Sequence, residues 1–153
     1  MFYLDAAATA PLRPEARHAM LAVLERGPGN ASSVHTPGKT AKATLIHARQ
    51  QVAQAFGART AEVVFTAGGT EANNLALKGI ATATPRGKHI VTTAIEHSSI
   101  RKSCEFLARV GGFEITEIGV DSMGRVDQAG AIAAIRDDIT LVSVGLANGE
   151  IGT

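Results

Sequence analysis

Apolar positions along the chain follow two patterns, one typical of helices and one typical of buried strands. Before residue 60 they recur every three or four positions, which predicts helices over 14–26 and 39–56. Gly27 and Gly57 follow these segments and are expected to end them. The stretch 27–38 is rich in Gly, Pro, Ser and Asn and is expected to form a long loop.

The second helix should bury one face, because its apolar residues share a stripe. That stripe consists of Ala41, Leu45, Ala48, Val52 and Phe56.

After residue 60, short runs rich in β-branched residues alternate with helical patterns. The expected strands are 62–66, 89–93, 113–120 and 140–146. The expected helices start near Thr70 and span 98–110 and 126–136. Strands alternating with helices predict an α/β fold with a mainly parallel sheet.

Composition excludes several classes of protein. The chain has 153 residues, of which 45% are hydrophobic and 19% charged, and its net charge of +1 does not favour nucleic-acid binding. It has no apolar run long enough to span a membrane and no signal-peptide pattern at its start, so a soluble, cytoplasmic protein is expected. The single cysteine, Cys104, excludes an internal disulfide, and no cluster has metal-ligand spacing.

In parallel sheets, ligands bind beyond the carboxyl ends of the strands, which selects the loops 67–70, 94–97 and 147–153. In the first loop, Gly68 and Gly69 should allow a sharp turn and a close approach of the backbone to a ligand. The helix that follows should offer free N–H groups at about 69–72, which together with the Thr70 hydroxyl suit a phosphate monoester. The alternative is a plain glycine turn with Thr70 as helix cap.

The other two loops carry single candidate residues. His97 could stack on a flat ring or act as an acid or base, or it could be a solvent-facing histidine at a helix start. Asn148 could bind a polar ring substituent, or it could belong to a simple strand-exit turn. Cys104 shares an apolar helix face with Ile100 and Leu107, so we expect it in the core and not as a nucleophile.

Five motifs in order are more specific than any one of them. They are YLDAAATAP (3–11), GNASSVHTPG (29–38), EVVFTAGGTEANNLALKG (62–79), IEHSSI (95–100) and LANGEIGT (146–153). From about Phe2 to Thr153 the chain resembles the N-terminal part of the cysteine desulfurases of the class V aminotransferase group. The resemblance implies a pyridoxal 5'-phosphate enzyme of the aspartate aminotransferase fold (fold type I), a sulfurtransferase that converts L-cysteine to L-alanine and holds the sulfur as a persulfide.

The resemblance also implies roles for four residues. Gly69 and Thr70 would bind the cofactor phosphate, and His97 would stack on the pyridine ring and assist proton transfer. The family asparagine near the ring hydroxyl falls on Gly149 here, so Asn148 would have to replace it.

The family's Schiff-base lysine, the aspartate that pairs with the pyridine nitrogen and the acceptor cysteine have no counterpart here. We therefore expect an N-terminal arm over 1–14 and an incomplete large domain over 15–153, without the rest of that domain or the small domain. Such a fragment is expected to be inactive alone. Its first strand, 62–66, would lack its usual neighbours.

The complete enzyme would be a homodimer that uses L-cysteine, serves a sulfur-acceptor protein and contributes to sulfur metabolism such as iron–sulfur cluster assembly. Two alternatives remain open. One is a fragment of another class V enzyme, such as a selenocysteine lyase or an aminotransferase. The other is a non-catalytic module that binds a phosphate ester or a partner.

Overall fold

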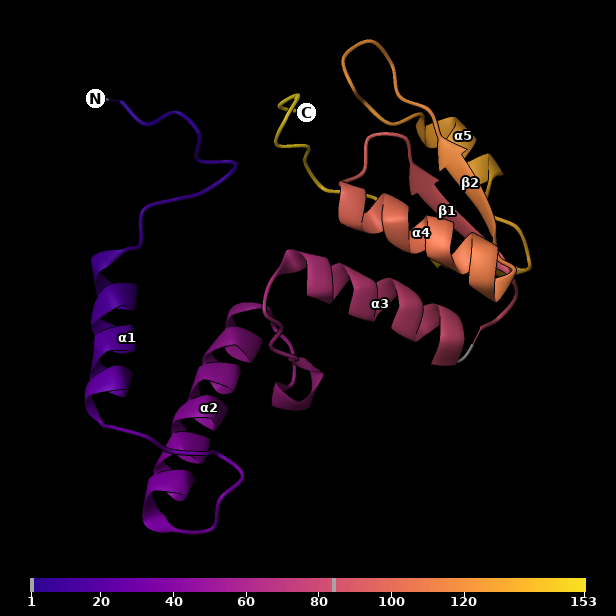
Figure 1. The fold of residues 1–153 in the computed structure, drawn as a ribbon. Coiled ribbons are helices and arrows are strands. Elements are labelled where there is room, and N and C mark those ends of the chain that lie inside the picture. Colours follow the sequence, from indigo (N-terminus) through magenta and orange to yellow (C-terminus); the bar gives the residue numbers. More distant parts are fainter. Residues whose placement is uncertain (1, 84) are drawn as a thin grey trace. The chain divides into compact units, whose positions relative to one another are not determined.

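The structure, a computed structural model, describes residues 2–83 and 85–153 (Figure 1). The chain divides into two compact units, one over residues 1–65 and one over 66–153. No helix among the described residues is long and apolar enough to cross a membrane.

The first unit is helical. It contains α1 (Pro14–Glu25), α2 (Thr36–Ala55) and the short 3-10 helix η1 (Thr60–Glu62). Both long helices are followed by the glycines that the sequence predicted as ends, and Gly27 and Gly57 have φ values of +80° and +63°. The left-handed conformation is easy for glycine and strained for other residues, so these two positions end their helices.

Helix α2 begins three residues earlier than predicted, because His35 caps it. The His35 ring nitrogen Nδ1 accepts a hydrogen bond from the Gly38 backbone N–H at 3.3 Å. At its other end the helix contacts the segment after η1, where the Arg49 Nε donates to the Val63 carbonyl at 3.1 Å.

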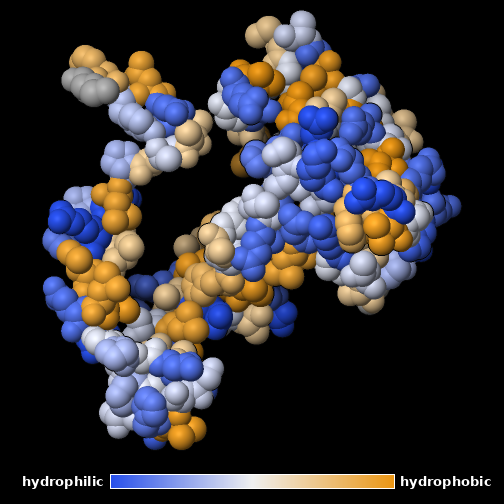
Figure 2. Space-filling view, viewed as in Figure 1, coloured by the Kyte–Doolittle hydropathy of each residue, from blue (hydrophilic) through white to orange (hydrophobic). Residues whose placement is uncertain are grey.

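The predicted buried stripe on α2 is wrong for this structure. Leu45 is 39% exposed and Phe56 82%, and Ala53, which is outside the stripe, is the buried apolar residue of the helix. Helix α1 buries none of its residues. Both helices therefore expose apolar side chains, and hydrophobic residues appear orange in Figure 2.

The second unit is an α/β layer. Its elements in chain order are α3 (Gly69–Ala83), β1 (His89–Thr93), α4 (Ser98–Gly111), β2 (Glu114–Ile118), α5 (Gln128–Ala133) and β3 (Ile139–Val142). The three strands form one parallel sheet in the order β2-β1-β3, which confirms the predicted parallel α/β class. Helices α3 and α4 pack side by side against this sheet (Figure 1).

The core of this unit lies between the central strand and the two helices. All five residues of β1 are buried. The cluster combines side chains from α3, β1 and α4 with one residue directly before β2. Its buried members are Leu77, Ala81, Ile90, Ile100, Cys104, Leu107 and Phe113. The prediction that Cys104 lies in the core with Ile100 and Leu107 is confirmed.

The predicted strand over 62–66 is absent. Residues 60–62 form η1, Val63 has an extended backbone, and 63–66 belong to none of the three strands. A strand needs a neighbour for its backbone N–H and C=O groups, so local β propensity alone did not produce one here.

Three other elements are shorter than their patterns predicted. Strand β2 covers 114–118 of the predicted 113–120, and α5 covers 128–133 of 126–136. Strand β3 stops at Val142 where the apolar run continues to 146. The ladder continues by one further bond, from the Ser143 N–H to the Val91 carbonyl at 2.8 Å, before the chain leaves the sheet.

Candidate phosphate-ester site at the sheet edge

The start of α3 presents backbone donors without protein acceptors. The Ala72 N–H already donates to the Gly68 carbonyl at 3.1 Å, so the free set is residues 69–71 and not 69–72. Within the described residues, neither these three N–H groups nor the Thr70 hydroxyl has a hydrogen-bond acceptor. Free donors at the positive end of a helix dipole favour an anion.

The Glu71 side chain lies at the turn that precedes these donors. Its carboxylate accepts the Ala67 backbone N–H at 2.7 Å, which closes the turn that leads into α3. The carboxylate thus has a structural partner, and the Thr70 side chain does not act as the cap that the alternative reading required.

The two glycines of this turn do not use the left-handed conformation that is special to glycine. Neither Gly68 nor Gly69 is among the glycines with positive φ, so the turn itself does not require them. A Cβ atom added at either position would meet no atom within 4 Å. The backbone here borders open space, and the predicted close approach of a ligand remains a prediction.

His97 lies directly before α4 and caps it. Its Nδ1 accepts the Ser99 backbone N–H at 3.1 Å, and the same nitrogen lies 2.8 Å from the Ser99 Oγ. The residue is exposed, so part of the alternative reading, a histidine at a helix start, describes the structure. The capping contacts use one ring nitrogen and leave Nε2 without a partner among the described residues.

A side-chain bridge connects this histidine to the donor-bearing helix. The Asn73 Nδ2 donates to the Ser99 Oγ at 2.8 Å. Asn73 lies three residues after Thr70, so both belong to neighbouring positions on one face of α3. The bridge therefore holds the start of α4, with His97, against the first turns of α3.

The loops after β1 and β3 are tied together. The Glu96 carboxylate accepts the Thr93 hydroxyl at 3.0 Å and the Gly145 backbone N–H at 2.6 Å. The Asn148 Nδ2 donates to the Ile95 carbonyl at 2.8 Å. The structure thus brings the three predicted loops to the same edge of the second unit.

Both ends of the Asn148 amide have structural partners. Its Oδ1 accepts the backbone N–H groups of Glu150 and Ile151 at 2.8 and 3.1 Å. This is the strand-exit turn that the alternative reading described. A cofactor-binding role for Asn148 stays a prediction, and Gly149 beside it is exposed.

The sequence reasoning missed three residues that organise this edge: Asn73, Ser99 and Glu96. Their signal was present but weak, because a serine two positions after a histidine and an asparagine one helical turn after a threonine are common. Only the folded chain shows that Asn73 and Ser99 meet.

Cys104 is unsuited to nucleophilic chemistry in this structure. It is 3% exposed, and burial raises the pKa of its thiol, with further contributions from Glu117 and Glu96. Among residues 2–83 and 85–153, no three His, Cys, Asp or Glu side chains are grouped to hold a metal ion.

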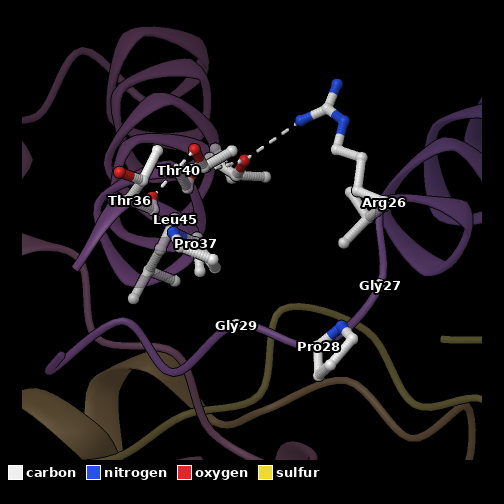
Figure 3. A pocket seen from close by; sticks show the side chains of 12 residues that line it. Arg26, Gly27, Pro28, Gly29, Thr36, Pro37, Thr40 and Leu45 are labelled. Carbon is white, nitrogen blue, oxygen red and sulfur yellow. Dashed lines mark hydrogen bonds between the residues drawn. The ribbon is translucent and has the colours of Figure 1, made fainter.

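The first unit has a separate cavity of about 620 Å³ between the end of α1 and α2. Arg26, Pro28 and Thr40 are among its lining residues, and the Arg26 guanidinium donates to the Thr44 hydroxyl at 3.3 Å (Figure 3). None of the four candidate site residues lines it.

The second unit is an α/β layer whose parallel sheet has a helix N-terminus with free donors and an imidazole at its carboxyl edge, an arrangement that suits an anionic ligand. The chain belongs to the aminotransferase class V family, whose model matches residues 2–153.

Several similar curated proteins are named cysteine desulfurases. The chain is 46% identical to cysteine desulfurase IscS of Dictyoglomus turgidum, over 99% of this chain and 38% of the relative. It is 45% identical to the IscS-like cysteine desulfurase of Mycobacterium tuberculosis (100% and 40%) and 43% identical to human cysteine desulfurase (98% and 33%). The chain thus spans about two fifths or less of the length of these relatives.

Solved structures support the same fold. A NifS-like protein matches with a TM-score of 0.90 at 33% identity, covering 97% of this chain and 41% of the other. SspA in complex with cysteine matches with a TM-score of 0.88 at 31% identity, covering 97% and 43%. The chain therefore has the fold of part of a type I pyridoxal phosphate enzyme, as predicted.

Class V aminotransferases and cysteine desulfurases depend on pyridoxal phosphate. The residues present fit the phosphate end of this cofactor, because three backbone N–H groups and the Thr70 hydroxyl have no acceptor in the part of the chain that the structure describes. They also fit a flat ring, because the His97 imidazole is exposed and held by its Nδ1.

Proposed function

We propose that this chain is the N-terminal part of a pyridoxal phosphate-dependent cysteine desulfurase and supplies the phosphate-binding and ring-stacking portions of its site. The observation that carries the proposal is the set of unpartnered donors at residues 69–71, bridged through Asn73 and Ser99 to His97. The cysteine desulfurase relatives support the reaction class.

In this proposal the N–H groups of residues 69–71 and the Thr70 hydroxyl bind the phosphate and so position the cofactor. The His97 ring would stack on the pyridine ring of the cofactor. Glu96 and Asn148 hold the loops around His97 and do not contact the cofactor. When bound, pyridoxal phosphate supplies an electron sink for the amino acid substrate.

The proposed substrate is L-cysteine. Its C–S bond breaks, L-alanine is released and the sulfur passes to a thiol other than that of buried Cys104. The proposed complete protein is a homodimer that delivers sulfur to an acceptor protein, with iron–sulfur cluster assembly as one destination. An N-terminal arm over 1–14, a large domain beginning at 15 and a cytoplasmic location remain parts of this proposal.

Binding to the 153-residue chain tests the phosphate site. The affinity for pyridoxal phosphate should exceed that for pyridoxal, which lacks the phosphate. Thr70→Val should weaken pyridoxal phosphate binding about fivefold, because it removes one hydrogen-bond donor without changing the shape of the side chain. Thr82→Val is the matched control, since the Thr82 hydroxyl donates to the Lys78 carbonyl within the same helix, far from its start.

Equal affinity for the two compounds would contradict the phosphate role. So would equal losses in Thr70→Val and Thr82→Val. For the reaction, the natural full-length protein that carries this chain should release L-alanine from L-cysteine when loaded with cofactor. Turnover of L-selenocysteine alone would favour a selenocysteine lyase instead.

A further inference from the structure

The Ser99 side chain lies between the imidazole of His97 and the side-chain amide of Asn73. Three polar groups meet at this position: the imidazole Nδ1, the Ser99 Oγ and the Asn73 amide. Ser99 is 6% exposed, so water has little access to compete for these contacts.

The direction of each hydrogen bond follows from one group that can only donate. The Ser99 backbone N–H points at Nδ1 of His97 at 3.1 Å, so this nitrogen must offer its lone pair. The Ser99 hydroxyl, 2.8 Å from the same nitrogen, is then a second donor that shares this one lone pair. Its oxygen keeps free lone pairs, and the Asn73 amide N–H fills one of them at 2.8 Å.

A neutral imidazole with an accepting Nδ1 carries its proton on Nε2. The opposite tautomer would place an N–H at Nδ1 against two donors. The ring therefore presents one free polar group, the Nε2–H, which has no acceptor among the described residues.

We propose that Ser99 and Asn73 are positioning residues that hold His97 in its Nε2–H tautomer, so that the ring acts on its ligand as a hydrogen-bond donor. This inference rests on the proposed function for the identity of the ligand. Asn73 donates a hydrogen bond to the Ser99 oxygen and so orients the Ser99 hydroxyl toward His97. That hydroxyl then donates to Nδ1, which disfavours the tautomer with a proton on Nδ1.

The test is the tautomer of His97, read from long-range proton–nitrogen NMR spectra of the ¹⁵N-labelled chain. Spectra are taken without cofactor at about pH 8, where histidine rings are ordinarily neutral. The His97 signals are those lost in His97→Gln. His18, exposed on α1, serves as the internal reference for a ring without such contacts.

We expect His97 to favour the Nε2–H form more strongly than His18 does. Ser99→Ala should lower the ratio of the two tautomers about fivefold, since it removes one hydrogen bond to Nδ1. Asn73→Asp should act in the same direction although the hydroxyl is still present, because the new carboxylate can only accept and draws the hydroxyl away from the ring.

Each variant has a matched control. Ser98→Ala removes a hydroxyl from the neighbouring exposed position of α4, and Asn74→Asp makes the same exchange at a residue whose amide donates to the Thr70 carbonyl. Both should keep the wild-type tautomer ratio. Asn73 is only partly buried, so Asn73→Asp keeps the test decisive if Ser99→Ala does not fold.

A His97 ratio equal to that of His18 would overturn the inference. So would Ser99→Ala and Asn73→Asp ratios that match those of Ser98→Ala and Asn74→Asp. No cofactor enters these measurements, so failure of pyridoxal phosphate to bind would count against the proposed function and would leave this result unchanged.

Discussion

Replacing Glu96 should loosen the sheet edge, because its carboxylate joins two loops. One oxygen of this carboxylate accepts the Gly145 N–H at 2.6 Å and the Thr93 hydroxyl at 3.0 Å. The first bond is short, as expected for a charged acceptor. The second satisfies a hydroxyl on a residue that is 1% exposed.

The size of the effect follows from these two partners. Glu96→Ala should lower the free energy of unfolding by about 2–4 kcal/mol, since it removes a charge-assisted bond and leaves the buried Thr93 hydroxyl unpaired. Glu96→Gln keeps an oxygen acceptor and should cost only about 1 kcal/mol. In a Thr93→Val background the cost of Glu96→Ala should fall by about 1–2 kcal/mol, because no hydroxyl is then left unpaired.

Urea unfolding followed by far-UV circular dichroism measures each of these values. Glu105→Ala, in α4, is the control, since Glu105 forms an exposed ion pair with Lys102 and should contribute little. The reasoning is refuted if Glu96→Ala costs no more than Glu105→Ala. It is also refuted if the losses in Thr93→Val and Glu96→Ala are additive in the double variant.

Three further predictions concern the second unit. Leu107→Ala should lower the free energy of unfolding by about 3–5 kcal/mol in urea, because Leu107 is 1% exposed. Val110→Ala, one turn along the same helix, should cost about 0.5 kcal/mol or less, because Val110 is 64% exposed. Similar losses in the two variants would contradict the assigned core. The raised pKa of Cys104 and its burial predict that a thiol reagent labels the native chain far more slowly than the urea-unfolded chain, and equal rates would contradict its burial. The Arg136 guanidinium holds the pKa of Glu114 below its ordinary value, so this pair stabilises the fold at neutral pH and the gain is lost as pH falls through the folded-state pKa. Arg136→Ala should therefore reduce the loss of stability on acidification. An unchanged loss of stability at acid pH would refute this linkage.

Much of the secondary structure could be predicted from local patterns. Gly27 and Gly57 adopt left-handed conformations directly after their helices, which is a property of the glycine itself. Strand β1 and helix α4 occur within one residue of their predicted ends, since each carries a strong local pattern. The parallel order of the sheet follows from helical crossovers between strands.

Other predictions failed where a partner from elsewhere in the chain decides the outcome. Residues 62–66 have the composition of a strand, yet they join none of the three strands found among the described residues. The apolar face of α2 has helical spacing, yet Phe56 is 82% exposed. Propensity and periodicity describe what a segment can form, and burial or pairing depends on what the fold places beside it.

At the candidate site, the sequence by itself determined which residues stand at the carboxyl ends of the strands and at the helix starts. Thr70, His97 and Asn148 were identified in this way. Only the tertiary structure decided how these residues are held: Ser99 and Asn73 meet across 26 positions of sequence, and Asn148 uses both ends of its amide within the turn and against Ile95. The physical reason is that a hydrogen bond depends on distance and direction in space, and a linear pattern specifies neither for residues on different elements.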